Sequence, residues 1–295
     1  MAPANSYHYR IVDVFTREKL QGNPLAVFLD SDGLSTELMQ AIAKEMNLSE
    51  TVFLCPAMRP ESAARLRIFT PGKEMDFAGH PTIGAAYVLL HEGLLQPETN
   101  RFSVDENVGV IPIRVDRCPE LMIWLTTPAI QEGATLSRRL AAALLGLHES
   151  DLHNADPQVL SAGNPTLFVP LRTPQIVDRA VFSEAAWQQV KRILPDPLCV
   201  FPFAPTPEGA YSRMFAPDYG LREDPATGSS TGPLAEYMMR HGMVSSKAGS
   251  RFVSEQGTKM GRRSLLHVAI HGEGGTEGIC VGGEVTPVME GRLRL

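Results

Sequence analysis

Short apolar runs dominate the hydropathy pattern of this chain. They are β-branched or alternating, and Gly, Pro, Asn or Asp bounds them, which is typical of β-strands. The runs are IVDVF, LAVFL, TVFLC, RLRIF, VIPIRV, LMIWL, TLFVP, LLHVAI and ICVGGEV. Helical spacing is confined to a few segments, such as residues 36–46 behind Ser35 as N-cap. Few helices among many short strands predict an α+β fold with mostly antiparallel sheet, not the regular alternation of a doubly wound sheet.

Several segments recur in the same order in the two halves of the chain. The pairs are the helices behind Ser35 and Ser137, the strands 51–56 and 166–170, RIFTP (67–71) and RMFAP (213–217), and the helices 85–93 and 234–242. One such match can arise by chance, but the shared order favours an internal duplication. We therefore expect two pseudo-symmetric domains, each a mostly antiparallel curled sheet around a central helix.

The predicted boundary lies in a linker at residues 127–136. It would separate a first half, 1–127, from a second half, 128–283, with the active site in the cleft between them. Whether the closing strand, 284–295, joins the first half is left open by the sequence alone. The glycine-rich segment 272–278 predicts a turn.

Charge and cysteine content narrow the class of protein. With 295 residues and a net charge of −6, the chain lacks the basic surface that nucleic acids or anionic membranes require. No stretch approaches the roughly 20 apolar residues of a membrane span. The beginning shows no secretory signal pattern, and the dispersed cysteines predict free thiols in a reducing compartment. We expect a cytoplasmic protein.

Both loops before the repeated helices have the composition of an anion-binding helix start. The first contains Gly79 and Pro81, and the second contains Thr227, Gly228 and Ser229. The first turn of a helix presents N–H groups and a partial positive charge, so it can bind a carboxylate or phosphate. Ordinary capping turns are the alternative, and the duplicated placement favours binding.

Glu50 stands between a helix and a strand in the first half. The sequence places Pro165 at the equivalent position of the second half, so the carboxylate occurs once. A group that serves the scaffold should be duplicated, whereas a chemical group in a shared site need appear only once.

Several of these segments resemble the PhzF-like family of phenazine-biosynthesis-type isomerases. They are NLSET (47–51), DFAGHPTIGAA (76–86), EDPATGS (223–229), EQG followed by GR (255–262) and VGG (281–283). The resemblance implies the fold of diaminopimelate epimerase, a homodimer, and no metal or cofactor. It also implies catalytic roles for Glu50, His80 and Asp224, and substrate contacts at Gly79, Gly228 and Ser229.

A single carboxylate can take a proton from one carbon and return it to another. The sequence thus predicts a cofactor-independent isomerase acting on a small carboxylate-bearing substrate through Glu50. Two alternatives stay open: a non-catalytic carboxylate-binding protein, and an amino-acid racemase or epimerase with non-thiol bases. A two-thiol racemase is disfavoured, because no cysteine lies in either helix-start loop. Residues 228–232 fit G-x-S-x-G, but the charged, proline-interrupted segment before them is not the buried strand that a serine hydrolase needs.

Overall fold

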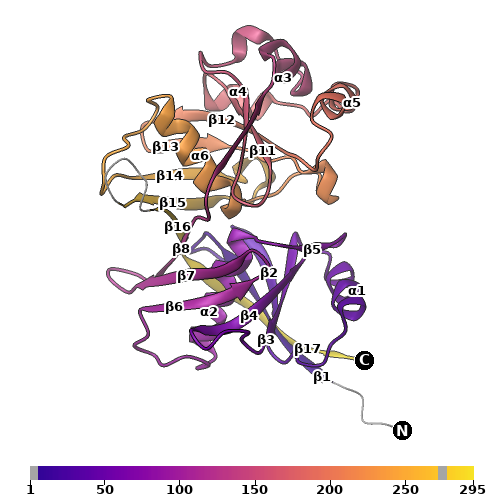
Figure 1. Cartoon of the computed structure of the whole chain (residues 1–295), viewed down its shortest axis with the longest axis vertical. Coiled ribbons are helices and arrows are strands. Elements are labelled where there is room, and N and C mark those ends of the chain that lie inside the picture. The colour runs from indigo at the N-terminus through magenta and orange to yellow at the C-terminus, as the bar shows by residue number, and fades with distance from the viewer. Residues whose placement is uncertain (1–5, 272–277) are drawn as a thin grey trace. The chain divides into compact units, whose positions relative to one another are not determined.

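The computed structural model describes residues 6–271 and 278–295. The turn predicted at 272–278 therefore falls almost wholly outside the described residues. The chain divides into two compact units, residues 1–126 with 281–295 and residues 127–280 (Figure 1). Among the helices described, none has the length and apolar character needed to cross a membrane.

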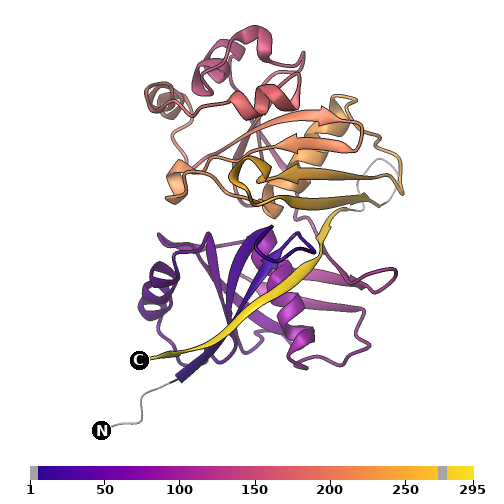
Figure 2. The same cartoon turned by 180° about the vertical axis from the view of Figure 1, so that it is seen from behind.

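The first unit is a mixed sheet with two helices. Its elements are β1 (Ser6–Val14), β2 (Asn23–Phe28), α1 (Thr36–Met46), β3 (Glu50–Cys55), β4 (Ser62–Phe69), β5 (Glu74–Met75), α2 (Gly79–His91), β6 (Arg101–Glu106), β7 (Gly109–Asp116), β8 (Met122–Thr126) and β17 (Val285–Arg294). Strands β17, β1 and β2 pair antiparallel, and β2 is parallel to β3. Strand β3 is antiparallel to β4, β4 is parallel to β6, and β6, β7 and β8 follow antiparallel. The closing strand thus lies beside β1, as Figure 2 shows in yellow and indigo.

Helix α2 is the central helix of this unit. Every residue from Gly79 to Leu89 is buried, and the helix contacts strands β1 to β4, β8 and β17. A helix that is apolar on all sides belongs inside a core. Helix α1 is amphipathic instead. It begins at Ser35, whose side chain accepts the N–H of Leu38, and it buries Met39, Ile42 and Ala43 against β3 and β4.

The second unit repeats this plan with more helices. Its elements are β9 (Gln131–Thr135), α3 (Arg138–Leu144), β10 (Gln158–Ser161), β11 (Thr166–Pro170), α4 (Pro174–Arg179), α5 (Glu184–Ile193), β12 (Cys199–Thr206), β13 (Gly209–Ser212), α6 (Gly228–Arg240), β14 (Arg251–Gln256) and β15 (Ser264–Ile270), with 3₁₀ turns at Glu149–Asp151, Pro217–Tyr219 and Thr258–Met260. Strand β16 (Ile279–Gly283) spans the point where the chain leaves this unit. Helix α6 is the buried central helix. Helices α3, α4 and α5 cover a separate apolar cluster that includes Leu144, Trp187 and Val190.

The strand pairings establish the duplication. In the second unit β9, β10 and β11 pair antiparallel, β11 is parallel to β12, β12 is antiparallel to β13, β13 is parallel to β14, and β14 is antiparallel to β15. The order of parallel and antiparallel pairs is that of the first unit, with β9 in the place of β17. The predicted α+β fold of two pseudo-symmetric halves, each around a central helix, is confirmed. Two parallel pairs in each unit were not foreseen; they arise because a helix connects their strands.

The topology corrects two of the equivalences drawn from sequence. Strand 166–170 is not the counterpart of 51–56, because β11 occupies the position of β2. The tripeptide Gly-Asn-Pro stands at the start of both strands, at residues 22–24, where β2 begins at Asn23, and at residues 163–165, directly before β11. Helix α1 likewise corresponds to α4 and α5, not to α3. Short apolar strands have similar compositions, so only their pairing partners tell them apart.

The linker predicted at residues 127–136 is also wrong in part. Residues 131–135 form β9, which pairs with β10. All five residues of β9 are exposed, so the strand carries no apolar pattern and only its backbone pairing defines it.

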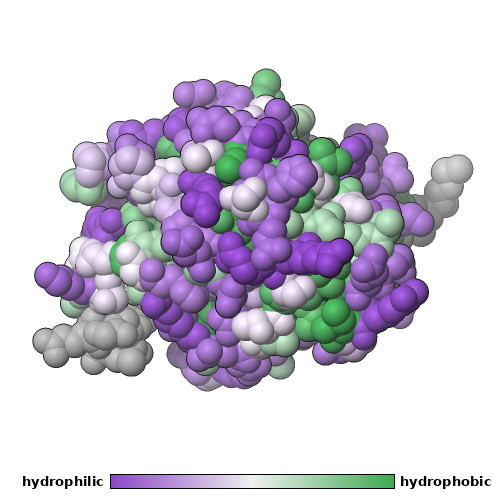
Figure 3. All heavy atoms as spheres, turned by 90° about the horizontal axis from the view of Figure 1, so that it is seen from above, coloured by the Kyte–Doolittle hydropathy of each residue, from purple (hydrophilic) through white to green (hydrophobic). Residues whose placement is uncertain are grey.

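The face drawn in Figure 3 is mostly hydrophilic, with hydrophobic side chains in small separate groups.

Close packing around α2 makes Gly84 a sensitive position. A Cβ atom there would lie 2.5 Å from Cδ2 of Leu25 and 2.9 Å from Cγ2 of Val14. We expect Gly84→Leu to lower the free energy of unfolding by about 1–3 kcal/mol, because overpacking strains a filled core. Gly72→Ala is the control, since its Cβ would meet only Oγ1 of Thr70 at 3.8 Å. Urea denaturation measures both, and equal stability of the two variants would contradict the packing of α2.

Candidate active site

The turn between α1 and β3 places Glu50. Asn47 at the end of α1 adopts the left-handed conformation (φ 51°), and the chain then enters β3 at Glu50. The Glu50 side chain is 13% exposed, and its Oε2 lies 3.5 Å from Nδ1 of His80. The structure thus brings together two of the predicted site residues, and the carboxyl group is largely withdrawn from bulk water.

His80 is the second residue of α2 and is only 3% exposed. Burial lowers the pKa of its imidazole to about 3, so the ring is neutral at physiological pH. The side-chain amide Nδ2 of Asn23 lies 3.3 Å from Nδ1 of this ring. A neutral ring that accepts a hydrogen bond at Nδ1 carries its proton at Nε2. Within the described residues this Nε2 is buried and has no hydrogen-bond partner.

A second cluster of polar groups surrounds the start of α6. Asp224 is buried, and its Oδ2 accepts a hydrogen bond of 2.5 Å from Oγ1 of Thr227. Gln256 donates from Nε2 to the Asp224 carbonyl (2.8 Å) and to Thr227 Oγ1 (3.0 Å), while its Oε1 accepts the Thr227 N–H (3.1 Å). Hydrogen bonds from Thr227 and Gln256 therefore fix the orientation of Asp224.

An equivalent asparagine contact supports each of the two clusters. Asn164 donates from Nδ2 to Oγ of Ser229, the second residue of α6, at 3.2 Å. This contact repeats that of Asn23 with His80, the second residue of α2. Both asparagines come from the Gly-Asn-Pro tripeptide, a repeat that the sequence reasoning missed although it is readable in the chain.

The position equivalent to Glu50 is Cys199, not Pro165. Leu25 of β2 lies opposite Glu50 of β3, and Thr166 of β11 lies opposite Cys199 of β12. Cys199 is buried at the start of its strand. The second unit therefore still has no carboxylate at this position, and of the two equivalent positions only that of Glu50 holds one.

The starts of α2 and α6 are suited to an anion. Gly79 and Gly228 are their first residues, and neither helix has an acidic residue in its first turn. Their N–H groups and partial positive charge favour a carboxylate there. The second positions hold His80 and Ser229, and no cysteine lies at either start.

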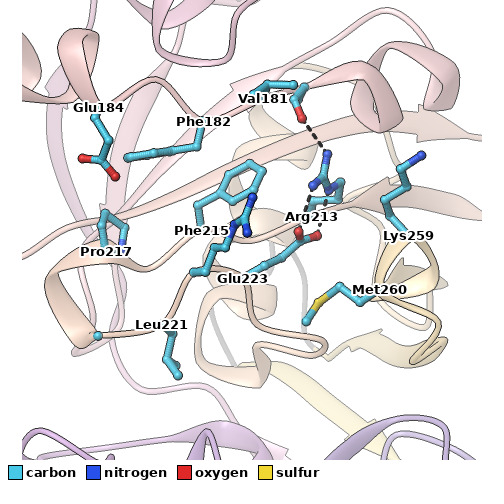
Figure 4. A pocket seen from close by; sticks show the side chains of 13 residues that line it. Val181, Phe182, Glu184, Arg213, Phe215, Pro217, Leu221, Glu223, Lys259 and Met260 are labelled. Carbon is cyan, nitrogen blue, oxygen red and sulfur yellow. Dashed lines mark hydrogen bonds and ion pairs between the residues drawn. The ribbon is translucent and has the colours of Figure 1, made fainter.

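A duplicated ion pair holds the strand end before each helix. Arg67 donates to Glu74 and stacks over Phe69 in the first unit. Arg213 does the same with Glu223 and Phe215 in the second. The pair of Arg213 and Glu223 borders a cavity of about 980 Å³ (Figure 4), which none of the predicted site residues lines. Since Glu223 directly precedes Asp224, the pair fixes the loop that carries this residue.

Among residues 6–271 and 278–295, no three His, Cys, Asp or Glu side chains are arranged to hold a metal ion.

Comparison with known proteins identifies the family. The profile of a family described as phenazine biosynthesis-like protein matches residues 12–291. The chain belongs to this family. A relative from Pseudomonas aeruginosa, named trans-2,3-dihydro-3-hydroxyanthranilate isomerase, is 35% identical over 98% of this chain and all of its own length. The predictions that the chain is PhzF-like and an isomerase are confirmed.

Two solved structures show how widely the fold is shared. A phenazine biosynthesis protein of the PhzF family from Bacillus anthracis matches with a TM-score of 0.87 and 27% identity, over 99% of this chain and 100% of that one. A hydroxyproline epimerase from Agrobacterium vitis matches with a TM-score of 0.67 over 98% of this chain and 93% of that one. Its identity is 12%, so it shares the fold alone.

The neutral state of His80 is directly measurable. We expect its imidazole to stay uncharged between about pH 8 and pH 5, because burial holds its pKa at about 3. Nitrogen-15 NMR should show a protonated Nε2 and an unprotonated Nδ1 throughout, with the signal assigned by its absence from His80→Gln. An imidazolium signal from His80 within this range would contradict the assignment.

Proposed function

We propose that the protein isomerises a small carboxylate-bearing substrate by moving a proton between two of its carbons, with Glu50 as both base and acid. One observation carries the proposal: the largely buried Glu50 carboxyl group lies beside the neutral ring of His80 at the start of α2. A carboxyl group out of bulk water can hold and release a proton without losing it to solvent.

The proposed reaction balances without another reactant. Glu50 as carboxylate removes a proton from a carbon next to a carbon–carbon double bond, and the electron pair shifts the double bond by one position. The carboxylic acid then returns the proton to the far carbon. Nothing is oxidised or reduced, so the step calls for no redox coenzyme. His80 would donate from Nε2 to the substrate.

Residues of the second unit complete the proposal. Asp224, held by Thr227 and Gln256, would bind a polar group of the same substrate, while Gly79, Gly228 and Ser229 would bind its carboxylate. The name of the Pseudomonas aeruginosa relative supports this class, because dihydrohydroxyanthranilate is a cyclic molecule with a carboxylate.

Replacing Glu50 tests the proton transfer. We expect Glu50→Gln to lower kcat by at least about 10²-fold, since the amide cannot accept the proton, while ligand binding persists. Glu45→Gln is the matched control, because Glu45 is an exposed carboxylate on the helix that leads to Glu50. Turnover and thermal-shift binding would be measured on a panel of cyclic carboxylates.

Normal turnover by Glu50→Gln would refute the role of this residue. Ligand binding without any product from the wild-type protein would favour the non-catalytic alternative. Inversion at one carbon, seen as a change in optical rotation, would favour a racemase or epimerase.

Asp224 tests the contribution of the second unit. We expect Asp224→Asn to lower kcat/KM about tenfold or more, because a buried charged hydrogen-bond partner is lost. Asp196→Asn, at an exposed aspartate of the same unit, should have no effect. Steady-state kinetics of both variants gives the comparison, and unchanged kcat/KM for Asp224→Asn would exclude Asp224 from the site.

A further inference from the structure

Glu106 is a buried acid that the proposed reaction does not use. It is the last residue of β6 and is 5% exposed. Its Oε1 contacts the hydroxyl group of Thr82, which in turn contacts the carbonyl oxygen of Ala78, the N-cap residue of α2. These contacts bracket the first turn of α2, which contains His80.

Counting protons at Thr82 shows what this contact requires. The Thr82 hydroxyl group donates to the carbonyl oxygen of Ala78 at 2.6 Å. A hydroxyl group has one proton, so it cannot donate to Glu106 at the same time. A proton on the Glu106 carboxyl group satisfies both contacts, because the acid can then donate to Thr82.

The second unit has an amide in the same place. Residues 101–106 read RFSVDE and residues 251–256 read RFVSEQ, and β6 and β14 occupy equivalent positions in the two sheets. Gln256 Oε1 accepts the N–H of Thr227, the N-cap residue of α6, so Gln256 also contacts the first turn of its central helix. Gln256 also donates from Nε2 to Thr227 Oγ1. An amide offers one acceptor and one donor side by side, and so does a neutral carboxylic acid.

We propose that Glu106 is a neutral carboxylic acid that fixes the first turn of α2 and so positions His80, as Gln256 fixes the first turn of α6. Glu106 is a positioning residue, since it acts through the helix and not on the substrate. Its effect on turnover rests on the proposed function, whereas its protonation does not.

The surroundings of Glu106 are consistent with this state. Burial raises the pKa of its carboxyl group to about 8, against the opposing effect of the neighbouring Thr82 and Ala78. The charged and titratable groups on the elements around it are Arg65 and Arg67 of β4, Glu74 of β5, His80, Tyr87 and His91 of α2, Arg101 and Asp105 of β6, and Arg114 and Asp116 of β7, with Asp76 in the loop before α2. Arg67 pairs with Glu74 and Arg59 with Asp105. None of the charged groups contributes to the shift of Glu106, so burial alone drives it.

The pH dependence of stability tests the protonation without any substrate. In the unfolded chain Glu106 loses its proton near pH 4.5, whereas in the folded protein it keeps the proton up to about pH 8. The folded state therefore binds more protons between these values, and stability falls as pH rises through them. Glu106→Gln keeps both hydrogen-bonding groups but cannot titrate. We expect its midpoint denaturant concentration, relative to wild type, to rise steadily from about pH 4.5 to about pH 8 and then to level off.

Infrared difference spectra between wild type and Glu106→Gln give a second readout. At pH 7 the wild type should show the C=O stretch of a protonated carboxylic acid that the variant lacks, and this band should disappear above about pH 8. The matched control is Gln256→Glu, which introduces an acid at the equivalent position and should gain such a band. A carboxylate band for Glu106 at pH 7, or parallel stability curves for wild type and Glu106→Gln, would overturn the protonation.

Kinetics tests the positioning of His80. Glu106→Gln should keep kcat within about twofold of wild type at pH 7 and should lose the decline in kcat that ionisation of Glu106 causes above about pH 8. Glu106→Ala removes both hydrogen-bonding groups and should lower kcat at least tenfold while changing the NMR signal of His80. Equal losses in the Gln and Ala variants would overturn the positioning role. If wild type turns over no substrate, the proposed function fails, while the stability and infrared measurements still decide the state of Glu106.

Discussion

The first amide groups of a buried helix must find partners inside the protein. Helices α2 and α6 are enclosed by strands, so water cannot serve them as it serves a surface helix. In each unit the last residue of a strand contacts the first turn of the helix, Glu106 through the Thr82 hydroxyl group of α2 and Gln256 through the N–H of Thr227, the N-cap residue of α6. This interaction fixes where each helix begins, and thereby which side chains occupy its first turn.

The functional groups differ between the units while the supports are repeated. An asparagine after glycine contacts the second helical residue in both units, and an arginine–glutamate pair holds the preceding loop in both. The side chains next to these repeated contacts differ between the units: they are His80 and Glu50 in the first unit, and Ser229 and Asp224 in the second. A duplicated scaffold can carry unlike groups, because the scaffold depends on backbone contacts and the chemistry depends on a few side chains.

The errors of the sequence reasoning have a common cause. Ser35, Ser137 and their helices were correctly predicted, because capping depends on residues close together in the chain. The counterpart of Glu50 was misplaced, because it is defined by which residue lies opposite it in a neighbouring strand. The sequence gives no sign of the role of Glu106 for the same reason: its contact, Thr82, is distant in sequence.

The sequence by itself determined the fold class, the family and the segments that carry Glu50, His80 and Asp224, because these depend on local pattern and on motifs of adjacent residues. The tertiary structure decided the parallel strand pairs, the contact of Glu50 with His80, and the burial of Glu106. Those features depend on removal from water and on distances between residues far apart in the chain. Neither property is present until the sheet closes around its helix.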